Sequence, residues 1–243
     1  MFSQQVGKSK EQKPSERMKA EVLDKLKNGI IVSCQPDEFG LFSRTEFIVE
    51  FAIAAELGGA TGIRTEGLEN IKAVKDKVKI PVIGLIKGKY PDGSVLITPD
   101  VEAVQKVIES GADIVAIDVT SRDERFKIFE EIRERYKDAI LMADVSTYEE
   151  GVISAELGAD VVATTLAGYT PYTKHSFKKY EPDFDLVYKL ASTLKVPIIA
   201  EGRIWTVEQA KKMFEIGAHA VVIGSAITRP RLIVQRFVEE IQK

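Results

Sequence analysis

The chain has 243 residues, of which 44% are hydrophobic and 29% are charged, and its formal net charge is −3. These values are typical of a globular protein with a large buried core, and so small a net charge gives no general attraction to nucleic acid or to an anionic membrane. The single cysteine, Cys34, excludes an intrachain disulfide and favours a cytoplasmic protein, and no apolar run approaches the roughly 18 residues of a membrane span.

The N-terminal part of the chain divides into a polar stretch and a helical one. Residues 1–16 are rich in Gln, Lys and Ser and hold few apolar side chains, so we expect a flexible tail there and a single domain over residues 17–243. Apolar residues then recur at helical spacing from Met18 to Leu26, and Asn28-Gly29 is a suitable helix end. This pattern predicts a helix that closes one end of the domain.

Eight apolar runs of buried-strand character follow at nearly even spacing, with room for a helix after each, and a Gly-Ala pair precedes every second run. Strands that alternate with helices require parallel crossovers, and eight such units in about 250 residues are typical of a (β/α)8 barrel. We therefore predict an α/β fold of the TIM-barrel class. The runs are Ile30 to Cys34, Gly62 to Arg64, Ile80 to Ile86, Ile114 to Asp118, Ile140 to Ala143, Val161 to Thr164, Val196 to Ala200 and Ala220 to Gly224.

Several helix starts carry their own signals. A hydroxyl residue followed three positions later by Glu or Gln has the spacing of a capping box, and Pro is favoured in the first turn of a helix. The capping boxes are predicted at Ser43 with Glu46, Thr147 with Glu150 and Thr206 with Gln209, and Thr98-Pro99 predicts a further start.

Two connections are longer than the roughly 2 to 6 residues usual between a strand and its helix. They run from Gly88 to Ile97 and from Leu166 to Pro182, and both follow strand ends. Long loops at that end usually serve a site, and the aromatic, Gly and hydroxyl residues of Gly168 to Thr173 would suit a lid over a small polar ligand.

In this fold the chemistry lies at the carboxyl ends of the strands, so the first polar residue after each run is informative. A single polar residue there can be a cap or part of a salt bridge, but one at every strand end indicates a site. In chain order they are Gln35, Arg64, Lys87, Asp118, Asp144, Thr164 with Thr165, Glu201, and Gly224 with Ser225.

Lys87 and Glu201 are the candidate catalytic residues. Burial at a strand end would lower the pKa of Lys87 toward the range useful for proton transfer or for a Schiff base, although a structural ion pair with Asp118 or Asp144 is the alternative. Glu201 can donate or accept a proton across the barrel mouth from Lys87, and its alternative is a simple salt bridge.

Asp118 with Asp144, and Cys34, also lie at strand ends, but their surroundings in the sequence do not favour a metal site or a nucleophile. Asp118 and Asp144 could supply paired carboxylates to a divalent cation, but no His stands with them, so we expect no metal site. Cys34 has no neighbouring His to activate it, and a buried core thiol is the expected interpretation.

The last two strand ends predict a phosphate site. Gly202-Arg203 and Gly224-Ser225 supply small residues whose backbone amides can approach an anion, and Arg229 opens the last helix. The ends of strands seven and eight are where this fold frequently binds phosphate, so the two signals support each other.

Taken together, these segments resemble the N-acetylmannosamine-6-phosphate 2-epimerases of bacterial sialic acid catabolism. The resemblance runs from about Leu26 to the C-terminus, and its motifs are specific as a set. They are Ile31-Val32-Ser33-Cys34-Gln35, Gly62-Ile63-Arg64, Gly84-Leu85-Ile86-Lys87, Ala143 to Gly151, Thr164 to Thr170, Ala200-Glu201-Gly202-Arg203-Ile204 and Gly224 to Pro230.

The resemblance implies a cofactor-independent isomerase that interconverts N-acetylmannosamine 6-phosphate and N-acetylglucosamine 6-phosphate. The family's catalytic lysine and glutamate match Lys87 and Glu201. Its substrate-binding positions match Gln35, Arg64, Asp144 and Arg229. Two departures are a longer segment before Leu26 and Gly88-Lys89 where an arginine is expected after the lysine.

Two other functions fit the same residues. A Schiff-base aldolase or another phosphate-binding barrel enzyme could use Lys87, and a catalytically silent barrel could bind a sugar phosphate as a sensor. Apolar residues near Leu232, Ile233 and Phe237 could pack on the barrel or on a second subunit. A homodimer is the expectation for this class, with a small phosphorylated amino sugar as ligand and neither nucleic acid nor membrane as partner.

Overall fold

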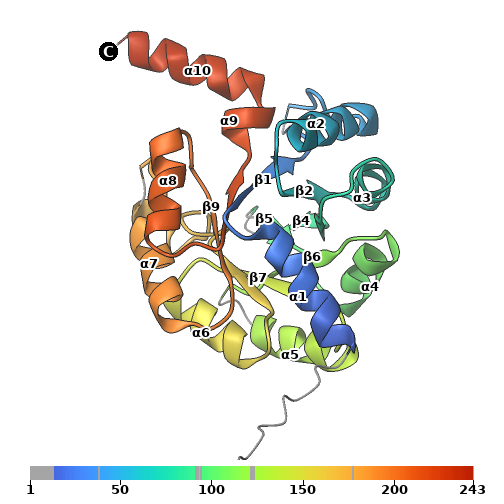
Figure 1. Cartoon of the computed structure of the whole chain (residues 1–243). Helices are drawn as coiled ribbons and strands as arrows, with labels where there is room; N and C mark the ends of the chain where they lie inside the picture. Colours follow the sequence, from blue (N-terminus) through green and yellow to red (C-terminus); the bar gives the residue numbers. More distant parts are fainter. Residues whose placement is uncertain are drawn as a thin grey trace, which may run out of the picture.

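The computed structural model describes residues 14–37, 39–90, 93, 95–120, 124–176 and 178–242. In these residues, eight parallel strands close into a barrel, and each pairs with its neighbour in chain order until β10 returns to β1 (Figure 1). This confirms the predicted TIM-barrel class. The barrel strands are β1 (Gly29–Cys34), β2 (Gly62–Glu66), β3 (Val82–Leu85), β6 (Ile114–Asp118), β7 (Ile140–Asp144), β8 (Val161–Ala163), β9 (Ile198–Glu201) and β10 (Ala220–Ile223).

Most of the helices surround the barrel as an outer ring, whereas the first helix covers one end of it and the last helix lies apart (Figure 1). None of those in the described part of the chain is long and apolar enough to cross a membrane. They are α1 (Pro14–Leu26), α2 (Thr45–Leu57), α3 (Leu68–Lys75), α4 (Val101–Glu109), α5 (Arg125–Arg135), α6 (Tyr148–Glu156), α7 (Phe184–Thr193), α8 (Val207–Glu215), α9 (Ser225–Thr228) and α10 (Pro230–Ile241).

Alternate residues of each strand fill the barrel interior, because successive side chains of a strand point to opposite faces. Interior residues such as Ala116, Met142 and Ile199 are fully buried in one apolar cluster, whereas their chain neighbours pack against the helices in another. The same alternation, continued two residues toward the carboxyl ends, places five polar side chains and one glycine above this cluster. The residues at these positions are Lys87, Asp118, Asp144, Thr165, Glu201 and Gly224.

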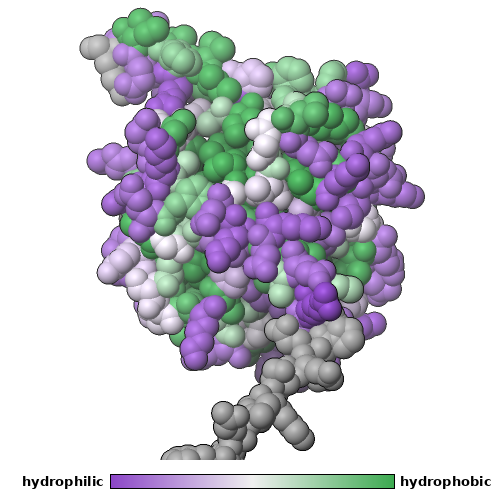
Figure 2. Space-filling model, viewed as in Figure 1, coloured by the Kyte–Doolittle hydropathy of each residue, from purple (hydrophilic) through white to green (hydrophobic). Residues whose placement is uncertain are grey.

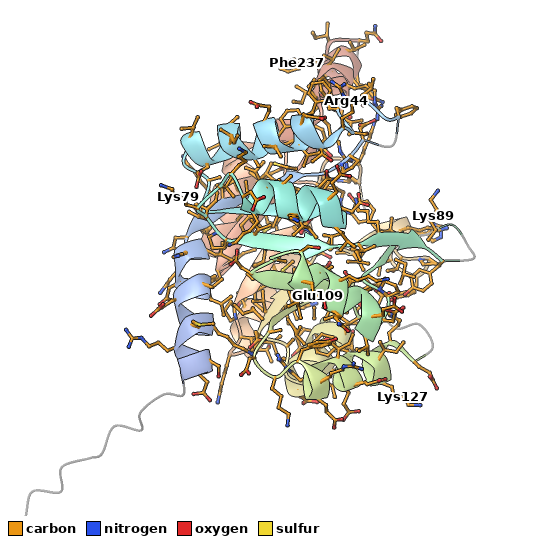
Figure 3. All side chains as sticks on the ribbon, turned by 90° about the vertical axis from the view of Figure 1, so that its right-hand side faces the viewer. Arg44, Lys79, Lys89, Glu109, Lys127 and Phe237 are labelled. Carbon is orange, nitrogen blue, oxygen red and sulfur yellow. The ribbon has the colours of Figure 1, made fainter. Side chains whose placement is uncertain are left out.

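The opposite end of the barrel is closed by α1. Leu26 is fully buried in the interior cluster, and Val22 and Leu23 pack against it. Figure 3 shows α1 on the side opposite the hairpin that carries Lys89. The predicted closing helix is therefore confirmed, although it begins at Pro14, so that residues 14–16 are helical; the rest of the predicted tail, residues 1–13, lies outside the described residues.

The repeated Gly-Ala pairs mark the ends of helices. Gly59, Gly111, Gly158 and Gly217 follow α2, α4, α6 and α8 and have φ values between 90° and 103°. This left-handed conformation is the usual stop signal at a helix C-terminus, where glycine avoids the steric cost of a side chain. The following alanine amide bonds back to the last helical turn, as from Ala60 to the carbonyl of Ala55 at 2.9 Å.

Two of the three predicted capping boxes are present. Thr147 with Glu150 and Thr206 with Gln209 each make both reciprocal hydrogen bonds. The prediction at Ser43 is wrong, because the Ser43 hydroxyl bonds to carbonyls of its own loop and α2 begins after Arg44. The start at Thr98-Pro99 is also displaced, because the Asp100 carboxylate caps α4 by accepting from the Ala103 amide.

Two segments differ from a simple loop or ring helix. The predicted loop from Gly88 to Ile97 instead contributes to an antiparallel hairpin of β4 (Lys87–Lys89) and β5 (Val95–Ile97), in which Lys87 pairs with Ile97. The last helix, α10, projects away from the ring of helices, and none of its residues is buried (Figure 1).

Candidate active site

A cavity of about 700 Å³ opens at the carboxyl ends of the strands. All but one of the residues predicted to be catalytic or to bind substrate line it, which places these groups in a single space, whereas the strand-end residues Asp118 and Thr164 lie outside the lining. The exception is Asp144, which is completely buried beneath the lining and contacts Arg64 and Thr165. The predicted residues in the lining are Gln35, Arg64, Lys87, Glu201, Gly202, Arg203, Gly224, Ser225 and Arg229.

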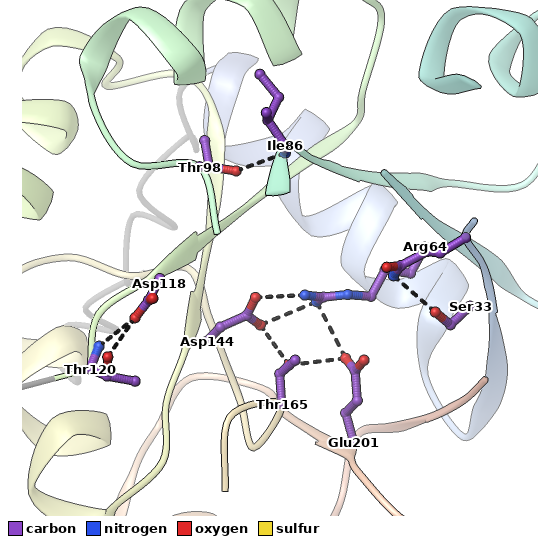
Figure 4. A network of polar contacts seen from close by, with 10 residues as sticks. Ser33, Arg64, Ile86, Thr98, Asp118, Thr120, Asp144, Thr165 and Glu201 are labelled. Carbon is purple, nitrogen blue, oxygen red and sulfur yellow. Dashed lines mark hydrogen bonds and ion pairs between the residues drawn. The ribbon is translucent and has the colours of Figure 1, made fainter. Parts of the chain in front are cut away.

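A charged network forms the floor of the cavity (Figure 4). Arg64 donates from Nη2 to Asp144 Oδ2 at 2.6 Å and from Nη1 to Asp144 Oδ1 at 3.1 Å. The same Nη1 lies 3.3 Å from Glu201 Oε2. One guanidinium therefore serves two carboxylates, with the bidentate pair to Asp144 as the stronger contact.

Burial acts on Glu201 in the direction that favours its protonated form. Loss of water raises the pKa of Glu201, and the charge of Asp144 raises it further. Arg64, the Thr165 hydroxyl and Lys87 act in the opposite direction without reversing the shift. The carboxyl group of Glu201 can therefore hold a proton at a higher pH than an ordinary glutamate.

The pKa of Lys87 is shifted in the direction that favours a general base. The Lys87 side chain is exposed within the cavity, where partial loss of water lowers its pKa, and the nearby cations Arg229 and Arg64 lower it further. Glu66 and Glu201 oppose this shift without cancelling it. A larger fraction of neutral amine is therefore present than on an ordinary lysine.

The alternative of a structural ion pair for Lys87 does not fit the positions of the two aspartates. Asp144 is engaged by Arg64, while Asp118 accepts from the Thr120 hydroxyl at 2.7 Å and from the Tyr90 hydroxyl at 3.2 Å. Within the described ranges, Lys87 makes no ion pair with either aspartate.

The two aspartates also face different partners, although Asp118 and Asp144 are paired in the register of β6 and β7. Figure 4 shows Asp118 turned toward Thr120 and Asp144 toward Arg64. Among the residues that the structure describes, no group of three or more His, Cys, Asp or Glu side chains is placed to hold a metal ion.

The candidate phosphate site is shaped by unusual backbone at β9 and β10. Gly202 has φ of 112° and Arg203 has φ of 56°, so two consecutive residues lie in the left-handed region. Gly224 precedes the short helix α9, and a Cβ atom there would lie 3.2 Å from the Ser33 Cβ atom. A side chain at position 224 would therefore crowd β1, and glycine keeps the backbone accessible.

The Arg203 side chain binds to the loop that follows β8. Its guanidinium donates to the carbonyl oxygens of Ala167 at 2.7 Å and Glu181 at 2.9 Å, and it lies over the Tyr169 ring. These bonds join both ends of the predicted long loop to β9. Arg203 thus lines the cavity while its charged group holds the loop in place.

The other two predicted substrate-binding groups lie on either side of these elements. Gln35 is nearly buried and donates from Nε2 to the Ser33 hydroxyl at 2.9 Å, which aligns its amide along the cavity wall. Arg229 precedes α10 and lies close enough to Lys87 to lower its pKa.

Cys34 takes no part in the cavity. It is fully buried, and burial raises the pKa of its thiol to about 12. The expected core thiol is therefore confirmed.

Thr165 and Glu66 were given no role in the sequence prediction, although Thr165 was named there beside Thr164 at a strand end. Thr165 follows β8 on the inward side and contacts both Asp144 and Glu201, and Glu66 stands two residues beyond Arg64 on the inward side of β2. Strand alternation was the available signal, since it favours Thr165 over Thr164 as the residue facing the cavity.

Known proteins of one family are similar to this chain over nearly its whole length. A family model described as "Putative N-acetylmannosamine-6-phosphate epimerase" matches residues 48–243. The protein of Caldanaerobacter subterraneus subsp. tengcongensis named "Putative N-acetylmannosamine-6-phosphate 2-epimerase" is 48% identical over 231 residues, which cover 93% of this chain and 96% of the relative. A relative of the same name from Clostridioides difficile is 41% identical over 91% of this chain and 99% of its own length.

A solved structure is similar to the same extent. The structure of the N-acetylmannosamine-6-phosphate 2-epimerase from Clostridium perfringens superimposes with a TM-score of 0.83 at 36% identity, covering 98% of this chain and all of that chain. Both sequence and structure therefore lead to one assignment: this chain belongs to the N-acetylmannosamine-6-phosphate epimerase family.

Proposed function

We propose that this protein interconverts N-acetylmannosamine 6-phosphate and N-acetylglucosamine 6-phosphate by removing and returning the proton at C2. The observation that carries the proposal is that Lys87 and Glu201 line one cavity together with the candidate phosphate-binding backbone. In this cavity the pKa of the lysine is lowered and the pKa of the glutamate is raised. Pairs of groups whose environments push their pKa values apart are typical of acid and base partners.

The chemistry requires both kinds of group. The C2 proton is acidic only when the sugar ring opens to the C1 aldehyde, because the electron pair left at C2 then moves into an enolate. Neutral Lys87 takes the C2 proton, and Glu201 assists either ring opening or the return of a proton to C2. Arg64 or Gln35 stabilises the oxyanion, and Asp144 acts by holding Arg64 in place.

The phosphate group anchors the substrate away from the reacting carbon. We assign its contacts to the backbone amides of Gly202, Arg203, Gly224 and Ser225 and to the charge of Arg229. The left-handed backbone after β9 and the short helix after β10 support this assignment. Binding energy from the phosphate then serves the reaction at the far end of the sugar.

The test follows deuterium at C2. The purified protein is incubated with N-acetylmannosamine 6-phosphate in heavy water and followed by NMR, and we expect the glucosamine epimer to appear with deuterium at C2. Lys87→Ala should abolish both conversion and exchange, and unimpaired exchange in that variant would remove Lys87 from the mechanism. A stable adduct at Lys87 after borohydride treatment with a candidate substrate would support the aldolase instead.

We also infer that the enzyme is a cytoplasmic homodimer. Val234, Phe237 and Ile241 of α10 are 61%, 66% and 81% exposed, and Figure 2 shows apolar surface on this projecting helix. Side chains of this kind are usually covered by a partner, and a second copy fits the expectation for the class. Light scattering should give the dimer mass, and Phe237→Ser should shift the population toward monomer.

A further inference from the structure

The hydroxyl of Thr165 lies between two carboxyl groups. Its Oγ1 atom is 2.6 Å from Asp144 Oδ1 and 3.0 Å from Glu201 Oε2 (Figure 4). A hydroxyl has one hydrogen to donate, whereas an ionised carboxylate can only accept. If both carboxyl groups were ionised, one of these two contacts would have no hydrogen between its oxygen atoms.

The charges identify the carboxyl group that carries the extra hydrogen. Asp144 receives two hydrogen bonds from Arg64, one to each oxygen, and is completely buried. Glu201 has a single, longer contact with the same guanidinium at 3.3 Å. One cation neutralises one buried carboxylate, and two like charges that share one guanidinium and one hydroxyl disfavour ionisation of both. The proton therefore belongs on Glu201.

Two successive threonines hold Glu201 in different ways. Thr164 faces outward and bonds to the backbone of Glu201, with its hydroxyl 3.0 Å from both the amide nitrogen and the carbonyl oxygen. Thr165 faces inward and contacts the carboxyl group of Glu201 and not its backbone. The first fixes the strand end, which leaves the second free to respond to the charge of Glu201.

We propose that Thr165 is a positioning residue that accepts a hydrogen bond from protonated Glu201 and donates one to it after Glu201 has released its proton. This inference rests on the proposed function. In the resting state Glu201 donates to Thr165, and Thr165 donates to Asp144. When Glu201 gives its proton to the substrate, the Thr165 O–H rotates to the new carboxylate, and Asp144 keeps its two bonds from Arg64.

The matched variants are Thr165→Val, Thr165→Ser and Thr65→Val. Valine keeps the shape of threonine and removes the hydroxyl, while serine keeps the hydroxyl. Thr65 is a suitable control because it is also fully buried in the barrel wall, but its hydroxyl has no hydrogen-bond partner in the described structure. Thr65→Val tests the same chemical change where no proton is involved.

Kinetics over a range of pH test the proposal. Thr165→Val should lower kcat at least about tenfold with little change in KM, and it should move the pH limb that disappears in Glu201→Gln to higher pH. Thr165→Ser should keep kcat and the position of this pH limb near those of the wild type, and so should Thr65→Val. Wild-type kcat and an unmoved limb in Thr165→Val would overturn the proposal, and so would equal losses in the valine and serine variants.

Infrared spectroscopy separates this proposal from the proposed function. A carboxylic acid band that is absent from Glu201→Gln reports protonated Glu201 without any substrate. We expect this band in the wild type, with a shifted frequency and titration midpoint in Thr165→Val. If the band behaves so while the wild type fails to epimerise the substrate, the proposed function fails and the role of Thr165 stands. If the wild type epimerises but lacks the band, the role of Thr165 fails.

Discussion

Arg64 and Asp144 share two hydrogen bonds beneath the cavity, and the two side chains are 1% and 0% exposed. Removing one partner of such a pair leaves the other charge buried and uncompensated, which costs about 3–5 kcal/mol of unfolding free energy. We therefore expect Asp144→Asn to lose about 3 kcal/mol in urea unfolding. The control is Glu102→Gln, which breaks an exposed helical pair with Lys106 and should leave the unfolding free energy nearly unchanged because solvent screens that pair. Equal losses in the two variants would contradict this account of the network.

The opposed shifts of Lys87 and Glu201 predict a bell-shaped dependence of kcat/KM on pH. Activity requires neutral Lys87, whose pKa is lowered by loss of water, and protonated Glu201, whose pKa is raised by burial. The group with the lower pKa sets the rising limb and the other group sets the falling limb, and both limbs should lie between the usual ranges of glutamate and lysine because the two shifts point inward. Steady-state kinetics measure both limbs, and a profile in Glu201→Gln that keeps both would exclude Glu201 as the source of one.

The helix-stop glycines predict a cost that comes from backbone conformation alone. Gly59 has φ of 91°, and a Cβ atom there would meet nothing within 4 Å. Gly59→Ala should therefore lower the unfolding free energy by about 1–2 kcal/mol through left-handed strain. Gly88→Ala is the comparison, because Gly88 lies outside the left-handed region and its nearest atom would be 3.8 Å away. That variant should stay within about 0.5 kcal/mol of the wild type in the same denaturant titration.

The buried thiol of Cys34 predicts a chemical and a thermodynamic result. Because its pKa is raised to about 12, the thiol should react with Ellman's reagent only after denaturant is added. An unfolded thiol ionises from about pH 9, so the folded state binds the proton more tightly. Stability from this group is present below that pH and declines as pH rises toward 12. Cys34→Ala should remove this alkaline decline, and rapid labelling of the native wild type would show that the site is open.

Much of the fold follows from local rules that the sequence displays directly. The closing helix before β1, the capping boxes at Thr147 and Thr206 and the helix-stop glycines depend on residues a few positions apart. Ser43 carries the same local signal as Thr147, but the loop carbonyls of Asp37 and Leu41 compete for its hydroxyl. A capping-box spacing therefore predicts a helix start only when no other acceptor in the preceding loop takes the hydroxyl.

The candidate site also has features that local patterns predict and features that they do not. Strand alternation identifies Lys87 and Glu201 as inward groups of one barrel mouth, and the cavity brings them together. The bridge made by Thr165 could not be predicted, because it depends on the relative depth at which β7, β8 and β9 end. That stagger is a property of the closed barrel, and no segment of the chain encodes it alone. The burial of Asp144 beneath the lining has the same origin.

The position of α1 at the end of the barrel opposite the cavity determines how a substrate can enter and a product can leave. In the described residues, Leu26 of α1 and the other interior side chains fill the barrel below the cavity, so the cavity is closed at that end. A sugar phosphate that reacts there must leave by the opening through which it entered. The two epimers then share one entrance to the cavity and one set of binding contacts. Each should therefore act as a competitive inhibitor of the conversion of the other.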